Sequence, residues 1–230
     1  PSAFEAQLAH LRAEGYRSAT PEEWQTAVRT RRPLTGRRVL ITFDDGYRDF
    51  STDDWPLLRK YDFAPTVFLP TGHIGGTSRW DSVYGEPAPL MTWDDIRRLA
   101  AEGVRFGAHT ATHPMLGSLA PTEVAREFLQ SRTVLRRALG EPVDLVAYPF
   151  GDYDSVVRVV AAACGFTMGF TCNSRRCALG DDLLTLPRLE ITDATSLTDF
   201  RHLLGEAVAV PPVLSTPATE LPAASQLLSR

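Results

Sequence analysis

The sequence predicts an α/β protein built around a mainly parallel sheet. Short apolar runs alternate along the chain with longer amphipathic segments, which is the pattern of repeated βα units. The 230 residues, 43% of them hydrophobic and 23% charged, suit one folded domain with or without a tail. The 16 glycines and 17 prolines follow no repeat, so collagen-like and low-complexity classes are excluded.

The strands are predicted from short apolar runs that end at turn residues. The first run, Arg-Val-Leu-Ile-Thr-Phe at 38–43, leads into the turn formed by Asp44, Asp45 and Gly46. Further strands are expected over 64–69, 104–108, 143–148 and 166–170, and residues 183–191 are expected to form one or two more.

The amphipathic segments predict the helices. The first thirty or so residues have a helical pattern, in which Thr20 caps a second helix that starts at Pro21. Thr92 is expected to open a helix over 92–103, and further helices are expected over 46–60, 121–139, 155–164 and 196–209.

Charge and hydropathy exclude two kinds of partner. The 24 basic and 28 acidic residues are spread along the chain and give a net charge of -4, which offers no footprint for nucleic acid. No apolar run reaches the roughly 18 residues of a membrane span, and the amino end lacks a signal pattern. Because the chain begins at Pro1, we expect it to be a processed or excised piece.

The three cysteines are an odd count, and a pairing of Cys172 with Cys177 is left open.

Two carboxylates follow the first strand directly. Asp44 and Asp45 lie at its carboxyl end, which in a parallel sheet is the edge where sites are built. Gly46 lets the backbone turn sharply, so both carboxylates can face one pocket. Taken alone, Asp-Asp-Gly is more typical of a solvated turn.

A later strand end adds two imidazoles, and a third strand end has an irregular bend fixed by Pro149 and Gly151. His109 and His113 are four residues apart, a spacing that suits metal ligands on a helical turn, although Pro114 favours a loop or a single turn. Taken alone, this pair is about as consistent with coincidence as with a metal site. Together, one carboxylate and two histidines make a facial metal triad, and a second carboxylate beside them can act as general base. The combination favours a hydrolase.

The chain resembles the polysaccharide deacetylases with the NodB homology domain, carbohydrate esterase family four, from about residue 38 to residue 191. The family motif T-F-D-D-G is present at 42–46, H-[ST]-x-x-H at 109–113, and P-[YF]-G at 149–151. The three motifs occur in the family order, each at a strand end. The resemblance implies a distorted, NodB-like (β/α) barrel with seven strands in place of the regular eight.

The resemblance also implies roles for individual residues. Asp44 is expected to be the catalytic base, while Asp45, His109 and His113 hold a divalent metal, usually zinc, with cobalt or nickel as alternatives. The backbone N–H of Tyr148 is expected to stabilise the oxyanion. The implied reaction removes N-acetyl groups from a polysaccharide or oligosaccharide of the N-acetylglucosamine type and releases acetate.

The chain departs from the family pattern in two places. Many members carry an arginine that orients the base where this chain has Ala147. Arg188 resembles an arginine of the branch with a Y-P-[YF]-G motif, and we expect it to pair with Asp44 and lower the Asp44 pKa. The histidine that many members use as general acid is not clearly present: His202 is expected to face solvent on a helix, and His73 lies in a loop.

The glycan is expected to bind on the loop over 72–89 and on the third motif. Trp80 and Asp81 lie in this loop with Tyr84, and a sugar ring can pack on an aromatic face. Pro149 and Phe150 are expected to contact the substrate from the third motif.

We divide the chain into three parts. Residues 1–36 are expected to be a helical segment that packs on the barrel, 37–209 the deacetylase domain, and 210–230 a tail or linker rich in Pro, Ala and Ser. The family's usual work on secreted and cell-surface polymers implies an extracytoplasmic or cell-surface location, with a cytoplasmic one as the alternative. Two other functions stay open, namely a hydrolase of the same fold acting on another C–N bond and a catalytically silent glycan-binding module. The oligomeric state is also left open.

Overall fold

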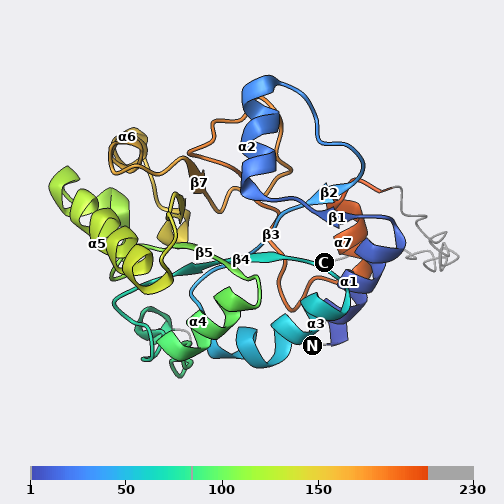
Figure 1. Cartoon of the computed structure of the whole chain (residues 1–230), viewed down its shortest axis with the longest axis horizontal. Coiled ribbons are helices and arrows are strands. Elements are labelled where there is room, and N and C mark those ends of the chain that lie inside the picture. Colours follow the sequence, from blue (N-terminus) through green and yellow to red (C-terminus); the bar gives the residue numbers. More distant parts are fainter. Residues whose placement is uncertain (1, 84, 207–230) are drawn as a thin grey trace, which may run out of the picture.

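A curled sheet of five parallel strands forms the centre of the molecule (Figure 1). The structure is a computed structural model that describes residues 2–83 and 85–206. The sheet order follows the chain, β3-β4-β5-β6-β7, so β3 and β7 are its two edges. Its strands are β3 (Ile41–Phe43), β4 (Pro65–Leu69), β5 (Arg105–Ala108), β6 (Leu145–Ala147) and β7 (Met168–Phe170), while β1 (Arg17–Ser18) and β2 (Arg38–Val39) form a separate parallel pair.

The predicted α/β class and the distorted, NodB-like (β/α) barrel are confirmed. The described residues contain seven strands, but only five belong to the curled sheet, so hydrogen-bonded strands do not close the barrel between β3 and β7. The predicted strand at 38–43 is divided at Leu40 into β2 and β3. The prediction of regular strands over 183–191 is wrong. Leu186 alone pairs there, in a parallel bridge with Phe170, and the next residue, Pro187, has no N–H to donate to a ladder.

Helices lie around the sheet, mostly where the amphipathic pattern predicts them (Figure 1). Thr20 and Thr92 cap α2 and α4 as expected, each accepting a backbone N–H bond while an acidic side chain three residues later bonds back. The helices are α1 (Ser2–Ala13), α2 (Pro21–Thr30), α3 (Trp55–Lys60), α4 (Trp93–Ala101), α5 (Pro121–Leu139), α6 (Ser155–Ala163) and α7 (Leu197–Leu203). Single turns occur at Phe50–Asp54, Arg79–Asp81, Leu116–Ser118 and Pro149–Gly151.

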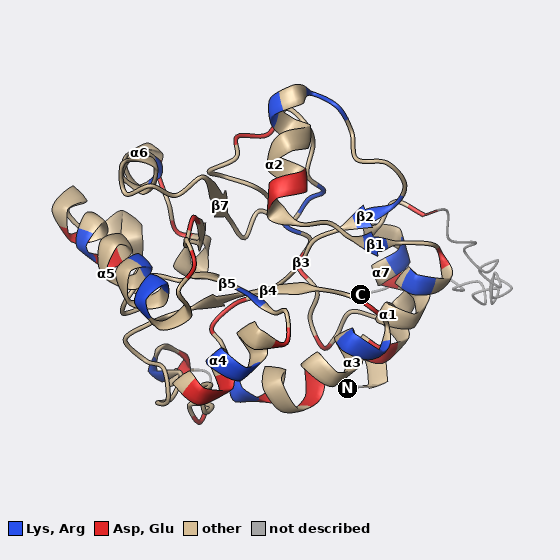
Figure 2. Ribbon diagram, in the orientation of Figure 1, with Lys and Arg blue, Asp and Glu red and all other residues tan. Residues whose placement is uncertain are grey.

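The amino-terminal segment contacts elements from distant parts of the chain. Helix α1 packs against α3 and α7, and β1 pairs with β2. The predicted tail at 210–230 lies outside the described residues. None of the described helices is both long enough and apolar enough to cross a bilayer. Basic and acidic residues are interspersed over the helices (Figure 2).

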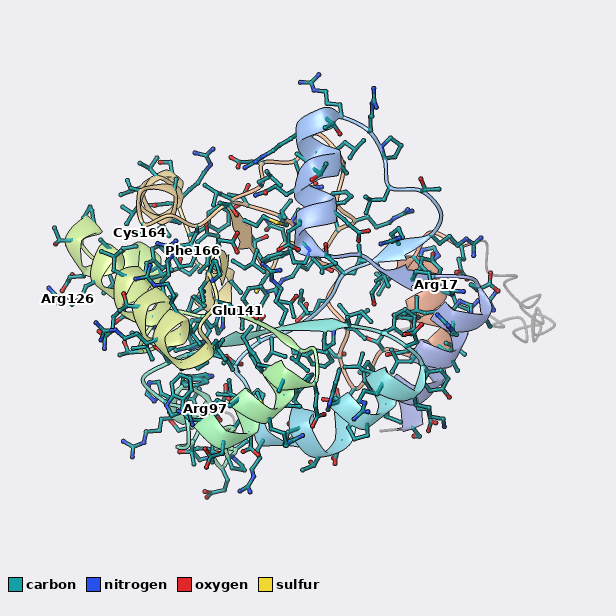
Figure 3. The ribbon with its side chains drawn as sticks, viewed as in Figure 1. Arg17, Arg97, Arg126, Glu141, Cys164 and Phe166 are labelled. Carbon is teal, nitrogen blue, oxygen red and sulfur yellow. The ribbon has the colours of Figure 1, made fainter. Side chains whose placement is uncertain are left out.

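Helix α5 covers one side of the sheet with aromatic contacts. Phe128 is fully buried, and its ring centroid lies 5.4 Å from that of Phe166 and 6.3 Å from that of Tyr148. Figure 3 shows Cys164 and Phe166 beside this helix. All three cysteines are free, so the pairing of Cys172 with Cys177 does not form.

Replacing Phe128 with alanine tests this packing. We expect Phe128→Ala to lower the free energy of unfolding by about 3–5 kcal/mol, because it removes a buried ring and leaves a cavity. The neighbouring Leu129 is 48% exposed, so Leu129→Ala should change stability by no more than about 0.5 kcal/mol. Urea denaturation measures both, and equal losses would contradict the assigned orientation of α5.

Candidate active site

Three chain segments meet at the edge of the sheet where the parallel strands end. Asp44 and Asp45 follow β3, His109 follows β5, and the Pro149–Gly151 turn comes shortly after β6. The carboxyl ends of parallel strands share one edge, and ligand sites of such sheets form there. β4 lies between β3 and β5 in the sheet, and Asp45 and His109, which follow β3 and β5, meet beyond the strand ends.

Asp45, His109 and His113 form the tightest cluster at this edge. Oδ1 of Asp45 lies 3.3 Å from Nε2 of His109 and 3.1 Å from Nε2 of His113, and the two Nε2 atoms are 3.2 Å apart. Tetrahedral zinc with bonds of about 2.0–2.1 Å requires ligand atoms about 3.3–3.4 Å apart. In addition, Oδ1 of Asp45 is buried without a well-formed hydrogen bond to any described residue. The cluster therefore fits a divalent metal in donor type and spacing.

The surroundings of the two histidines suit ligation. Nδ1 of His109 lies 2.8 Å from the carbonyl of Ala147, which only accepts, so Nδ1 carries the proton and Nε2 is left to ligate. Burial lowers the pKa of His113 and favours the neutral imidazole that metals bind. Burial alone would raise the pKa of Asp45, but close contacts with both histidines outweigh it and hold that pKa well below its usual range.

Asp44 lies beside this cluster and is paired with Arg188, as the sequence predicted. The guanidinium donates to both carboxylate oxygens of Asp44, each at 2.7 Å. Arg188 is itself held by the carbonyl of Thr171 at 3.0 Å and the hydroxyl of Thr42 at 3.2 Å. Burial alone would raise the pKa of Asp44, but the charge and hydrogen bonds of Arg188 outweigh it and keep the pKa below its usual value. Asp44 is therefore ionised at neutral pH.

Backbone strain concentrates at the same edge. Six non-glycine residues in the described ranges have positive φ, and four of them, Asp45, Thr110, His113 and Phe150, belong to this site. Such conformations cost on the order of 1 kcal/mol or more each, and they cluster at functional sites. The strain is a second observation, beside the side-chain cluster, that makes this edge the candidate site.

The structure corrects the role expected of Tyr148. Its N–H donates to the carbonyl of Phe170 at 3.0 Å as part of the sheet. Its ring is fully buried, and its hydroxyl donates to the carbonyl of Leu184 at 2.8 Å. Because this N–H already bonds within the sheet, it is not free to bind an oxyanion.

The bend after Tyr148 offers a different backbone donor. Pro149 has no N–H, and the N–H of Gly151 donates to the carbonyl of Tyr148 at 2.9 Å. The N–H of Phe150 between them donates to no acceptor among the described residues. The Phe150 ring lies 4.6 Å from the ring of His113, so this bend borders the cluster of Asp45, His109 and His113.

Aromatic side chains surround His113. The Trp80 ring stacks on the imidazole at 4.2 Å with an interplanar angle of 24°, and Phe150, which is 50% exposed, meets it edge-on. Asp81 accepts a hydrogen bond from the hydroxyl of Tyr47, a residue that carried no motif in the sequence. Pro149 is buried, so its position supports a role in shaping the bend rather than the predicted contact with sugar.

The remaining predicted residues belong neither to the cluster of Asp45, His109 and His113 nor to the Asp44–Arg188 pair. Nε2 of His73 lies 3.3 Å from the carbonyl of Thr112, and its ring meets Trp80 edge-on at 5.2 Å. His202 is exposed on α7, as expected. Tyr84 lies outside the described residues. Sequence reasoning missed Glu127, which bonds to the loop between the two histidines, because a glutamate on an amphipathic helix gives no local signal.

Comparison with known proteins identifies the family. The family model for polysaccharide deacetylase matches residues 31–169, and the chain belongs to that family. Among solved structures, the deacetylase PplD of Streptococcus pyogenes in complex with acetate is 28% identical with a TM-score of 0.77, covering 88% of this chain and 86% of that one.

Two sequence relatives carry related names. YxkH of Bacillus subtilis, provisionally named a polysaccharide deacetylase, is 26% identical over 86% of this chain and 67% of its own length. The poly-β-1,6-N-acetyl-D-glucosamine N-deacetylase of Escherichia coli K12 is also 26% identical, over 86% of this chain. The match spans about a third of that relative, 34% of its length.

Removing Arg188 tests the ion pair. Arg188→Met should lower the free energy of unfolding at pH 7 by about 1–3 kcal/mol, because it leaves the partly buried Asp44 carboxylate without its counter-charge and its two charged hydrogen bonds. Adding Asp44→Asn to this variant should restore part of the loss, and urea denaturation measures both.

The loss of stability caused by Arg188→Met should depend on pH, with a sign set by the pKa of Asp44. The folded pKa of Asp44 lies below its unfolded value of about 3.9, so the pair contributes fully above that value and less as the pH falls through the folded pKa. The stability difference between wild type and Arg188→Met should therefore shrink at low pH. A difference that grows on acidification would contradict the pairing.

Proposed function

We propose that this protein is a metal-dependent N-deacetylase that removes acetyl groups from an N-acetylglucosamine-type polysaccharide or oligosaccharide and releases acetate. One observation carries the proposal: the Asp45, His109 and His113 cluster and the Asp44–Arg188 ion pair lie side by side at one edge of the sheet. We assign the activity to a domain over 37–209, with 1–36 packed on it.

The names of the relatives support the substrate class. Several are poly-β-1,6-N-acetyl-D-glucosamine N-deacetylases, which act on a polymer of N-acetylglucosamine by name. We therefore favour a β-linked polymer of this sugar as the substrate, reached outside the cytoplasm or at the cell surface.

Asp45, His109 and His113 would hold the metal. Two imidazole nitrogens and one carboxylate oxygen suit zinc, and cobalt or nickel accept the same donor set. When bound, a divalent metal polarises the amide carbonyl and lowers the pKa of a neighbouring water.

Asp44 acts as the general base. Its ionised carboxylate takes a proton from the attacking water, whose oxygen adds to the carbonyl carbon of the acetamide. Arg188 keeps Asp44 ionised and fixes its orientation through two hydrogen bonds. The C–N bond then breaks, and the proton held on Asp44 is available to the leaving sugar nitrogen. The products are acetate and a free amine.

Backbone and aromatic groups complete the site. We assign the oxyanion donor to the N–H of Phe150 in place of that of Tyr148, since it borders His113 and has no acceptor among the described residues. The exposed Phe150 ring and the Trp80 indole offer apolar surface to a sugar face, and Asp81 offers an acceptor for its hydroxyls.

Acetate release tests the activity. The chain, stripped of metal and reconstituted with zinc, cobalt or nickel, should release acetate from N-acetylglucosamine oligomers only when metal is present. Metal-dependent cleavage of a different amide would favour a hydrolase of another C–N bond. Glycan binding without turnover in the metal-loaded protein would favour the silent binding module.

Two substitutions separate the roles of the carboxylates. Asp45→Ala should abolish tight zinc binding, because it removes one of three ligands. Asp44→Asn should retain zinc yet lower kcat by about 10²–10⁴-fold, because it removes only the base. Metal analysis and kcat distinguish the two, and an unchanged kcat in Asp44→Asn would exclude it as base.

A matched pair of histidine variants provides the control. His113→Ala should lose zinc, whereas His202→Ala, exposed on α7, should keep both zinc and activity. Loss of zinc in His202→Ala would contradict the assignment of the ligands.

A further inference from the structure

Glu127 connects α5 to the loop that carries both histidines. Its Oε2 accepts the backbone N–H groups of Ala111 and Thr112, each at 2.8 Å. Its Oε1 accepts the hydroxyl of Thr112 at 2.8 Å. All three bonds fall on residues that lie between His109 and His113.

This loop depends on outside support because its backbone is not helical. Thr110 and His113 have φ values of 64° and 60°, which are strained for residues with a side chain. The carbonyls of Thr110 and Ala111 accept N–H groups from Thr71 and Gly72 at 3.2 and 2.7 Å. The segment after β4 thus holds the carbonyl side of the loop, and Glu127 holds the N–H side.

The chemistry of this contact favours a carboxylate. Two successive backbone N–H groups that point at one oxygen form an anion-binding concavity. Hydrogen bonds to an ionised acceptor are stronger than those to a neutral one. A neutral amide at position 127 would keep an acceptor oxygen but lose the charge.

We propose that Glu127 is a positioning residue that sets the metal affinity of the Asp45, His109 and His113 cluster. Its three hydrogen bonds hold the strained loop in the conformation in which the two Nε2 atoms stand 3.2 Å apart. Without them the loop relaxes its positive φ angles, and part of the binding free energy goes into ordering the ligands again. The inference rests on the proposed metal site.

The test compares two carboxylates on one helix. Glu123 lies one turn earlier on α5 and accepts the N–H of Ala120 at 2.9 Å, with no hydrogen bond to the histidine loop among the described residues. Glu123→Ala therefore removes one hydrogen bond from a backbone N–H to a carboxylate on the same helix without touching the histidine loop. Glu127→Ala and Glu127→Gln are measured beside it for zinc Kd by chelator competition, for the visible spectrum of the cobalt form, and for the Tm of the metal-free protein.

We expect Glu127→Ala to weaken zinc binding by about 10- to 100-fold, the range found for groups that support metal ligands. Glu127→Gln should fall between this variant and wild type, and it remains informative if the alanine variant does not fold. The cobalt spectrum should change in Glu127→Ala. Glu123→Ala should lower Tm while leaving the zinc Kd and the cobalt spectrum unchanged.

Two results overturn the inference, and they are distinguishable. Tight zinc binding by wild type, with Kd values for both Glu127 variants within about twofold of it, would give Glu127 a merely structural role and leave the proposed function intact. No zinc binding by wild type would overturn the proposed metal site and the inference with it.

Discussion

The ion pair between Arg188 and Asp44 is the interaction on which the geometry of the site depends. Asp44 follows β3, one edge of the sheet, and Arg188 lies two residues beyond Leu186, which pairs with β7 at the other edge. The same guanidinium also bonds to the hydroxyl of Thr42 in β3. Side chains thus join the two edges where strand hydrogen bonds do not, and the contact that closes the barrel also keeps the proposed base ionised.

The location of this arginine shows that a charge can reach a carboxylate from more than one place in the fold. The resemblance predicts an arginine that orients the base at the position of Ala147, but β6 (Leu145–Ala147) contains no charged side chain. Arg188 supplies the charge from beyond β7, held in place by the carbonyl of Thr171 and flanked by the rings of Phe68 and Phe170 at 6.0 Å. Asp44 needs a fixed cation nearby to stay ionised. In this chain the segment after β7 carries that cation.

The rest of the site is held by contacts from several elements at once. The strained residues Asp45, Thr110, His113 and Phe150 lie on three separate segments, and none of these segments forms a regular helix or strand through its functional residue. Glu127 from α5 and the backbone after β4 support one of them, and the turn that begins at the buried Pro149 shapes another. These contacts hold the histidine loop and the bend beside it in place.

The sequence by itself determined the α/β class, most strands and helices, the two threonine caps and the identity of the residues at the strand ends, because periodicity and turn chemistry are local. It also predicted the Asp44–Arg188 pair, through a resemblance rather than through spacing. It misplaced the strand at 183–191 and the oxyanion donor at Tyr148, since ladder pairing and free N–H groups depend on neighbours distant in the chain. Only the tertiary structure decided that the N–H of Phe150 meets no acceptor in the described part of the chain, that Trp80 stacks on His113 and that Glu127 bonds to the histidine loop, because each depends on contacts between segments far apart in sequence.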